Sequence, residues 1–206
     1  MTEDEARDWV SGQVDAAAFD RIGRFVDLVV AENQRQNLIS PATIATIWER
    51  HVVDSLQLLT IVSADAGRWL DIGTGGGFPG MVLAIAGARP IMMVEPRRKR
   101  AEFLRDCVAT LGLEDAKVAA SKVEQVDWVA DVITARAVAS VEKLLLAAAH
   151  CATTSTRWLL PRGTVDVASL PALCARHQLV FHVKQSLTHP DSSIVFFSPM
   201  VSGGRA

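Results

Sequence analysis

The stretch Asp71–Gly80 is the part of the chain whose residue types and spacing indicate chemistry most directly. It reads Asp-Ile-Gly-Thr-Gly-Gly-Gly-Phe-Pro-Gly, and five of its last eight residues are glycine. Because glycine has no Cβ, such a loop allows its backbone to approach a bound ligand closely. A short apolar run precedes the loop and a helical pattern follows it, which is where a doubly wound sheet binds ligands. The stretch therefore predicts a ligand site at the end of a strand.

Two kinds of ligand fit this loop. Residues 75–80 match the Gly-x-Gly-x-x-Gly pattern of dinucleotide sites, and Glu95 lies 20 residues after Gly75, where an acid that binds ribose is expected. Asp71 favours a different ligand, because a carboxylate at the strand end repels a pyrophosphate. S-adenosylmethionine has no phosphate, and its α-amino group suits Asp71, directly or through water. We therefore expect S-adenosylmethionine, with a nicotinamide cofactor as the alternative.

Positive charge is concentrated in the run Arg97–Arg100, just after the second predicted strand. Cations at a helix N-terminus oppose the helix dipole by roughly 0.3–1 kcal/mol each at low salt. Contact with phosphates offers a reason for the run, and a solvated helical turn is the alternative. Arg136 follows the fourth predicted strand, so we expect it at the same edge, near an anion or a base. A structural salt bridge is the alternative there.

Histidine and cysteine spacing argues against a metal site and against disulfides. The five histidines form no His-x-x-x-His pattern, and the three cysteines (Cys107, Cys151 and Cys174) are far apart in the sequence. We expect these cysteines to be buried apolar side chains in a reducing compartment. His51 lies on the apolar face of a predicted helix, three residues before Asp54, so a buried histidine paired with Asp54 is the simplest interpretation.

Helical patterns occupy the first third of the chain, and strands alternate with helices after it. Apolar spacing predicts helices at residues 16–32 and 41–62. Apolar runs predict strands at residues 69–73, 91–95, 117–120, 131–134 and 157–160, with helices from about residue 78 and at 97–112, 141–151 and 165–177. Two further predicted strands, 179–184 and 193–197, lie too close together for a crossover helix, so we expect them to pair antiparallel.

These elements predict an α/β fold with a mostly parallel seven-stranded sheet, an antiparallel strand near the C-terminus and helices on both faces. We expect a helical extension at residues 1–66, followed by one compact ligand-binding unit at 67–206. The chain carries 21 Lys and Arg against 23 Asp and Glu, a net charge of −2, which argues against a basic coat over the whole surface. An acidic N-terminus and the lack of an 18-residue apolar run predict a cytoplasmic protein with no membrane partner.

Several segments match one family pattern in order along residues 37–163. The glycine loop resembles the pattern D-(V/I)-G-(T/S)-G-x-G-(F/L)-P-G, and the other matching segments are Asn37-Leu38, Arg50–Leu56, Lys99–Leu104, Ser121–Glu124 and Thr134–Ala137. Together they resemble the glucose-inhibited division protein B family of bacterial 16S ribosomal RNA guanine-N7 methyltransferases. The resemblance implies a Rossmann-like class I methyltransferase fold that uses S-adenosylmethionine.

The resemblance also implies roles for individual residues. It places methyl-donor contacts at Gly73, Phe78, Val123, Glu124 and Arg136, while loop and strand geometry adds Asp71, Gly75 and Glu95. It gives His51 and Asp54 a part in shaping the site. After the fifth predicted strand the family usually has Leu-Lys-Gly, whereas this chain reads Leu160-Pro161-Arg162-Gly163. Arg162 thus stands in place of the lysine. We expect Arg162 to contact RNA, together with Arg97, Arg98, Lys99 and Arg100.

The implied reaction is methyl transfer to N7 of a guanine in 16S ribosomal RNA, in the decoding region of the small ribosomal subunit. The substrate is the free RNA or the assembled subunit, and we expect the enzyme to act as a monomer. N7 carries a free lone pair and loses no proton on methylation, so no catalytic base is expected. An NAD(P)-dependent oxidoreductase and a non-catalytic RNA-binding module are the alternatives.

Overall fold

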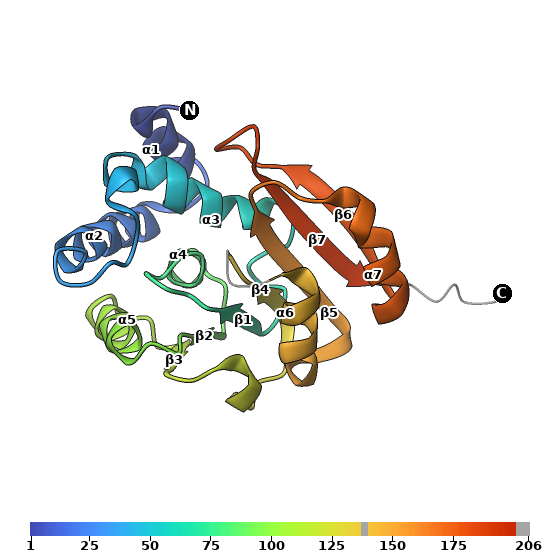
Figure 1. The fold of residues 1–206 in the computed structure, drawn as a ribbon. Coiled ribbons are helices and arrows are strands. Elements are labelled where there is room, and N and C mark those ends of the chain that lie inside the picture. The colour runs from blue at the N-terminus through green and yellow to red at the C-terminus, as the bar shows by residue number, and fades with distance from the viewer. Residues whose placement is uncertain (137–139, 201–206) are drawn as a thin grey trace.

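A single sheet with helices on both faces forms the centre of the computed structural model, which describes residues 1–136 and 140–200 (Figure 1). Its strands are β1 (Trp69–Ile72), β2 (Ile91–Val94), β3 (Ala116–Ala119), β4 (Ala130–Thr134), β5 (Ala152–Arg162), β6 (Leu179–Gln185) and β7 (Ser193–Pro199). Their order is β3-β2-β1-β4-β5-β7-β6. Strand β7 is antiparallel to β5 and β6, and the pairs among β1 to β5 are parallel. The predicted seven-stranded, mostly parallel sheet is confirmed.

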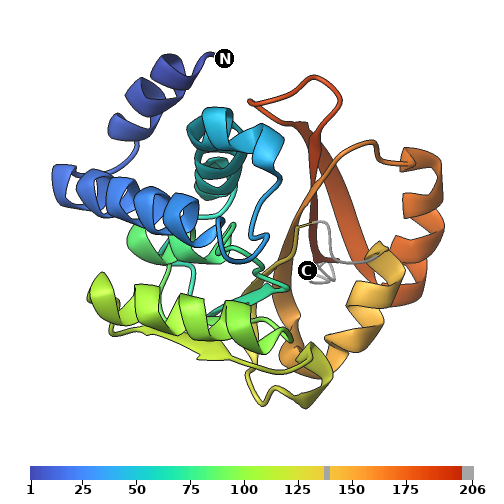
Figure 2. The same ribbon diagram turned by 60° about the vertical axis from the view of Figure 1, so that its left-hand side comes forward.

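The helices divide between the two faces of the sheet, as Figures 1 and 2 show. One face is covered by α1 (Glu3–Ser11), α2 (Ala16–Glu32), α4 (Gly80–Ile85) and α5 (Arg98–Thr110), and the other by α6 (Val141–Ala147) and α7 (Leu170–His177). Alternation along β1 explains the division, because Trp69 packs with the first group and Leu70 with the second. Both side chains are fully buried, as expected for a parallel strand between two helical layers.

The N-terminal helices share a core with the sheet. Ile22 of α2 and Trp48 belong to the same buried cluster as Met81 of α4 and Ile91 of β2. Helix α2 begins where the sequence predicts, because the Asp15 side chain accepts a hydrogen bond from the Ala18 backbone N–H at 2.7 Å. The predicted boundary near residue 66 therefore separates two parts of the sequence that build one core.

The helix predicted at residues 41–62 is wrong in its detail. A 3₁₀ turn occupies Pro41–Thr46, a π-helical turn Trp48–Val53, one α-helical turn (α3) Asp54–Leu56, and a 3₁₀ turn Gln57–Thr60. Threonine, isoleucine and valine are frequent here, and their β-branched side chains crowd a regular helix. The Glu3 carboxylate of α1 also accepts hydrogen bonds from the backbone N–H groups of Trp48 and Glu49, which starts a new turn at that point.

Smaller differences concern the second half of the chain. The helix predicted to reach residue 151 ends at Ala147 and is followed by a 3₁₀ turn, while β5 begins five residues earlier than the predicted 157. Helix α7 begins at Leu170 rather than at 165. The predicted burial of all three cysteines is confirmed. None of the helices among the described residues has the length and apolar composition needed to cross a membrane.

Candidate functional site

Four parallel strands deliver the candidate residues to one edge of the sheet. Gly73 directly follows β1, Glu95 follows β2 and Arg136 lies just beyond β4, while Val123 and Glu124 come after β3. Carboxyl ends of parallel strands meet at the same edge, so residues far apart in the sequence lie close in space. This edge is where the sequence predicts the ligand.

A cleft at this edge consists of two adjoining pockets. The polar pocket, about 380 Å³, is lined by Leu38, Ile39, Gly73, Thr74, Gly75, Gly76, Phe78, Glu95, Pro96, Arg97, Arg100 and Arg136. The apolar pocket, about 620 Å³, is lined by Ile72, Gly73, Val94, Pro96, Lys122, Val123, Glu124, Lys143, Leu144, Leu146 and Ala147. Gly73 and Pro96 line both, so the two pockets adjoin, and together they are called the cleft here. The cleft brings together the residues that are predicted to contact the methyl donor, with the exception of Asp71.

Asp71 lies beneath the cleft rather than in its wall, and its side chain is fully buried. Its Oδ1 accepts a hydrogen bond from Thr134 Oγ1 at 2.8 Å, and its Oδ2 accepts from Thr74 Oγ1 at 2.7 Å and from the Gly80 backbone N–H at 2.9 Å. Burial raises the pKa of Asp71, and these three hydrogen bonds oppose the rise. Oδ2 thus holds the loop and α4, and Oδ1 is bound to Thr134 of β4. Asp71 lines neither pocket, and its contact with the methyl donor, directly or through water, stays a prediction.

The loop itself is shaped by glycine and by Glu95. Gly75 has φ +61°, which residues with a Cβ rarely adopt. Its N–H donates a hydrogen bond to Glu95 Oε2 at 2.9 Å, and the Arg97 N–H donates to Glu95 Oε1 at 2.8 Å. Each carboxylate oxygen has a second lone pair, so Glu95 can also accept hydrogen bonds from a ligand in the polar pocket.

Arg136 connects the cleft with the N-terminal segment. Its Nη2 lies 2.8 Å from His51 Nδ1, and its Nη1 donates to the Arg50 carbonyl at 3.3 Å and to Asp54 Oδ2 at 3.4 Å. The guanidinium also lies over the Phe78 ring, 5.7 Å from its centroid. Burial lowers the pKa of Arg136, while the Asp54 carboxylate raises it. The salt bridge weighed as the alternative therefore exists, and Arg136 lines the polar pocket as well.

His51 and Asp54 do not pair with each other as expected. His51 is buried between Arg136 and Thr43, whose Oγ1 lies 2.9 Å from Nε2. Burial, with the charges of Arg136 and Arg50, lowers the pKa of His51 to about 3, so the ring is neutral. The π-helical turn explains the error, because spacing on a regular helix does not describe this segment.

The basic run divides between the cleft and the solvent. Arg97 and Arg100 line the polar pocket, and Arg100 donates a hydrogen bond to the Asn37 carbonyl. Arg98 is exposed and forms an ion pair with Glu102 at 2.7 Å, and Lys99 is exposed. The run begins α5 at the rim of the cleft, as the sequence predicts.

Arg162 lies apart from these residues, at the end of β5. It lines a separate pocket of about 390 Å³ between α6 and α7, with Ser140, Thr164 and Arg176 among the other lining residues. The structure therefore does not place Arg162 in the wall of the cleft. Ala137, the last residue of the matching segment Thr134–Ala137, lies outside the described residues.

Other residues of the site carry little signal of their own in the sequence. Leu38 and Ile39 form one wall of the polar pocket, and Leu144 of α6 lines the apolar one. The Asn33 side chain holds the first wall, because its Oδ1 accepts hydrogen bonds from the N–H groups of Leu38 and Ile39 at 2.8 and 3.0 Å. Only the match at Asn37-Leu38 pointed to this segment, and apolar residues such as Leu144 cannot be told from core residues by sequence.

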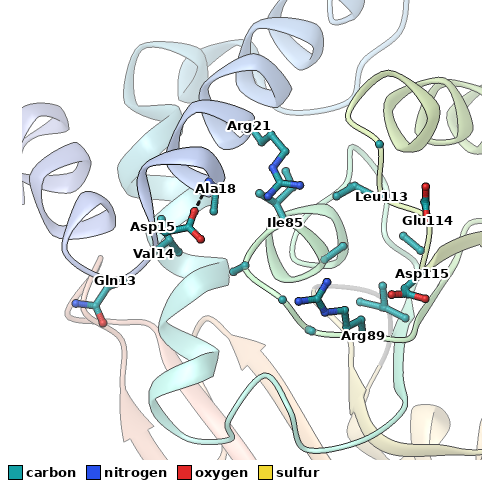
Figure 3. A pocket seen from close by; sticks show the side chains of 17 residues that line it. Gln13, Val14, Asp15, Ala18, Arg21, Ile85, Arg89, Leu113, Glu114 and Asp115 are labelled. Atoms are coloured by element: carbon teal, nitrogen blue, oxygen red, sulfur yellow. Dashed lines mark hydrogen bonds between the residues drawn. The ribbon is translucent and has the colours of Figure 1, made fainter.

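A different cavity lies at the opposite, amino-terminal edge of the sheet. It measures about 410 Å³, and Figure 3 shows Arg21 of α2 and Arg89, which precedes β2, extending toward it, with Asp115 beside them. None of the predicted site residues lines it. In the part of the chain that the structure describes, no group of three histidine, cysteine or acidic side chains could hold a metal ion.

The geometry of the loop argues against a dinucleotide. In dinucleotide folds the pyrophosphate binds at the start of the helix that follows the first strand. Here the first N–H group of α4, that of Gly80, already donates to Asp71, and this carboxylate lies directly behind it. A pyrophosphate would therefore meet a carboxylate and an occupied N–H. The last glycine of the Gly-x-Gly-x-x-Gly pattern, Gly80, thus serves close packing of α4 rather than phosphate binding.

Solved structures share this fold at low sequence identity. A SAM-dependent methyltransferase from Aquifex aeolicus superposes with a TM-score of 0.60 at 14% identity, covering 82% of this chain and 98% of that one. The ribosomal protein L11 methylase of Lactobacillus delbrueckii subsp. bulgaricus also has a TM-score of 0.60, at 13% identity over 71% and 76% of the two chains. These likenesses establish a Rossmann-like class I methyltransferase fold.

Sequence comparison is more specific. The model of the family GidB, rRNA small subunit methyltransferase G, matches residues 19–193. The ribosomal RNA small subunit methyltransferase G of Erythrobacter litoralis is 42% identical over 207 residues, covering 100% of this chain and 98% of that protein. The protein of the same name from Sphingopyxis alaskensis is 43% identical over 198 residues, covering 94% and 84%. The chain therefore belongs to the GidB family of small-subunit ribosomal RNA methyltransferases.

Proposed function

We propose that this chain transfers a methyl group from S-adenosylmethionine to N7 of a guanine in 16S ribosomal RNA. The single observation that carries the proposal is the cleft of two adjoining pockets at the carboxyl edge of the sheet, in a chain that matches the family over residues 19–193. The family membership and the geometry of Asp71 and Gly80 both favour S-adenosylmethionine over a nicotinamide cofactor.

The residues of the cleft fit S-adenosylmethionine in size and polarity. The apolar pocket beside Val123 and Leu144 suits the adenine ring, and the Glu95 carboxylate suits the ribose hydroxyls. At the polar end, Arg136 suits the carboxylate of the amino-acid tail. When bound, S-adenosylmethionine supplies an electrophilic methyl group on a sulfonium. What the protein supplies is the alignment of that group with the base.

Methylation at N7 requires positioning rather than proton transfer. The N7 lone pair lies in the plane of the base and loses no proton, so no side chain needs to act as a base. His51 agrees with this, because its two ring nitrogens already contact Thr43 and Arg136. Holding reacting atoms about 3–3.5 Å apart and in line contributes roughly 7–11 kcal/mol to lowering such a barrier.

The charge that develops during transfer limits what Arg136 can contact. Positive charge moves onto the guanine ring as the new bond forms, so a cation placed against N7 would oppose the reaction. Arg136 therefore serves the carboxylate of the methyl donor, the O6 atom of the base or a phosphate. Its place in the wall of the polar pocket agrees with these contacts.

RNA binding is assigned to the rim of the cleft. Arg97 and Lys99 are exposed there, at the start of α5, and phosphate contact suits them because it needs cations but no base-specific geometry. Arg162, at the end of β5 on the same edge of the sheet, stays a predicted RNA contact that lines a separate pocket. The enzyme acts as a monomer in the cytoplasm, on the small ribosomal subunit or on its free RNA.

The proposal is tested by methyl incorporation from labelled S-adenosylmethionine into small-subunit RNA. RNA from a strain that lacks this protein should accept one methyl group, and mass spectrometry should place it on a guanine as 7-methylguanine. RNA from the parent strain is the control and should accept none. Folded protein that binds RNA but transfers no methyl group would indicate an RNA-binding module instead.

A further inference from the structure

Arg136 contacts three acceptors on one short segment, and they are not equivalent. The distance from Arg136 Nη2 to His51 Nδ1 is 2.8 Å, whereas the contacts to the Arg50 carbonyl and to Asp54 Oδ2 are 3.3 and 3.4 Å. Hydrogen bonds weaken as they lengthen, and bonds to a charged donor at about 2.8 Å are the strong ones. His51 therefore fixes the direction of the guanidinium more than the other two groups do.

The hydrogen bonds around His51 determine which ring nitrogen carries the proton. Thr43 Oγ1 donates its only proton to the Ser40 carbonyl at 2.9 Å. The contact of 2.9 Å between Thr43 Oγ1 and His51 Nε2 must then be donated by the ring. Nδ1 is left with a lone pair facing Arg136, whose guanidinium can only donate. The contact with Thr43 and the contact with Arg136 therefore both select the Nε2–H tautomer of His51.

Asp54 supplies charge to this arrangement rather than direction. Its Oδ1 accepts hydrogen bonds from Gln57 Nε2 at 2.9 Å, from Thr188 Oγ1 at 3.2 Å and from Ser186 Oγ at 3.3 Å. Only Oδ2 faces Arg136, at 3.4 Å. The carboxylate is held by these other partners, so it stabilises the positive charge of Arg136 without controlling the plane of the guanidinium.

We propose that His51 is the positioning residue for Arg136, and that Thr43 acts through it by holding the ring in its neutral Nε2–H form. A hydroxyl group that does not line the cleft thus determines how Arg136 presents its N–H groups to the ligand. The identity of that ligand rests on the proposed function, whereas the hydrogen-bond chain from Ser40 to Arg136 stands on the geometry alone.

The surroundings of His51 keep it neutral. Arg136 and Arg50 are the cations that face the ring, Asp54 is the nearby acid on the same segment, and the Phe78 ring packs against it with 5.0 Å between the centroids. A second proton would remove the acceptor for Arg136 and place a third cation among these groups. The lowered pKa of His51 agrees with this.

The first test is the tautomer, read by nitrogen NMR of the protein labelled with ¹⁵N-histidine. The His51 signals are identified as those that disappear in His51→Gln. We expect the shifts of a protonated Nε2 and an unprotonated Nδ1, unchanged between about pH 8 and pH 5.5. A protonated Nδ1, or a titration in that range, would overturn the proposal.

The second test compares two substitutions at Thr43. Thr43→Ser keeps the hydroxyl, whereas Thr43→Val keeps the shape and removes it. By calorimetry, Thr43→Val should weaken binding of S-adenosylhomocysteine roughly tenfold, which is about what one hydrogen bond between Arg136 and a charged ligand group contributes. The His51 signals of this variant should show mixed tautomers. Thr43→Ser should match the wild type in both measurements.

The outcomes separate this inference from the proposed function. Equal affinities and unchanged His51 signals in both Thr43 variants would contradict the role given to Thr43. If the tautomer and the affinities follow expectation while RNA accepts no methyl group, the hydrogen-bond chain stands and the proposed substrate is wrong. Melting temperatures of the two variants show whether each is folded.

Discussion

Asp71 and Gly80 together explain how α4 reaches its place above β1 and β2. The Gly80 N–H donates to Asp71 Oδ2, and a Cβ on Gly80 would lie 2.7 Å from that oxygen and 2.7 Å from Met93 Cγ. Neither neighbour can move easily, because Asp71 is held by two further hydrogen bonds and Met93 is fully buried. The last glycine of the loop is therefore a packing requirement.

We predict that Gly80→Ala destabilises the fold by roughly 1–3 kcal/mol, the usual cost of overpacking, and weakens S-adenosylhomocysteine binding. Gly23→Ala is the matched control, because Gly23 lies within α2 and a Cβ there meets nothing within 4 Å. That control should stabilise the protein by roughly 0.5–1 kcal/mol. Denaturant unfolding measures both, and a Gly80→Ala protein as stable as Gly23→Ala would contradict the packing argument.

His51 makes stability depend on pH with a defined sign. The unfolded chain binds a proton at the ordinary pKa of 6.5, whereas the folded chain does so only near 3. Between these values the unfolded state holds more protons, so stability is lost as the pH falls, by about 1.4 kcal/mol per pH unit. We expect the difference in unfolding free energy between wild type and His51→Gln to be constant above about pH 7.5 and to shrink below pH 6.5. Parallel curves down to pH 5 would show that His51 titrates normally.

Among the elements, the segment that joins α2 to the first 3₁₀ turn forms a wall of the cleft without regular structure of its own. Asn33 holds it from one side through Leu38 and Ile39. From the other side, Gln36 donates to the Lys99 carbonyl of α5 at 3.3 Å. The segment thus ties the helical extension to the rim that is proposed to meet RNA.

For this wall we predict that Asn33→Leu loosens residues 38 and 39, because two N–H groups lose their acceptor. Asn33→Asp keeps an acceptor oxygen and serves as the control. Hydrogen exchange at these two amides should rise roughly tenfold or more in Asn33→Leu, as expected when a hydrogen bond of about 1–2 kcal/mol is lost. Unchanged exchange in Asn33→Leu would mean that packing alone holds the wall.

How far the sequence predicts each element depends on how regular that element is. The helix predicted at 16–32 from its apolar spacing agrees with the structure to the residue, because the Asp15 cap begins the helix where that spacing starts. The region 41–60 was not, because contacts from Glu3, 45 residues away, start a new turn at Trp48. The same irregularity makes the predicted pairing of His51 with Asp54 wrong. The observed partner, Arg136, is 85 residues away in the sequence, so local spacing does not reveal it. Motif positions are predictable from the sequence, whereas the buried role of Asp71 depends on the packing of β1, β4, the glycine loop and α4.

At the scale of the whole molecule, the net charge of −2 gives little general attraction to RNA. We therefore expect phosphate contacts to come mainly from a local surface, the start of α5 that is proposed above to meet RNA. We predict that replacing Arg97, Arg98 and Lys99 with alanine flattens the salt dependence of RNA binding, lowering the slope of log K against log salt by roughly 2–3. The control replaces Arg21 and Arg89, which extend toward the cavity at the opposite edge (Figure 3), together with Lys117 near the start of β3. It removes equal charge and should leave the slope nearly unchanged. Equal effects of the two triple substitutions would refute a local surface.

The whole account depends on one cleft holding both ends of the methyl donor, and a crystal structure of the complex with S-adenosylhomocysteine tests this most directly. We expect the adenine between Val123 and Leu144, the ribose hydroxyls on Glu95 and the carboxylate of the tail beside Arg136. A ligand bound at another surface, or turned so that the tail meets Val123 and the adenine meets Arg136, would contradict the account.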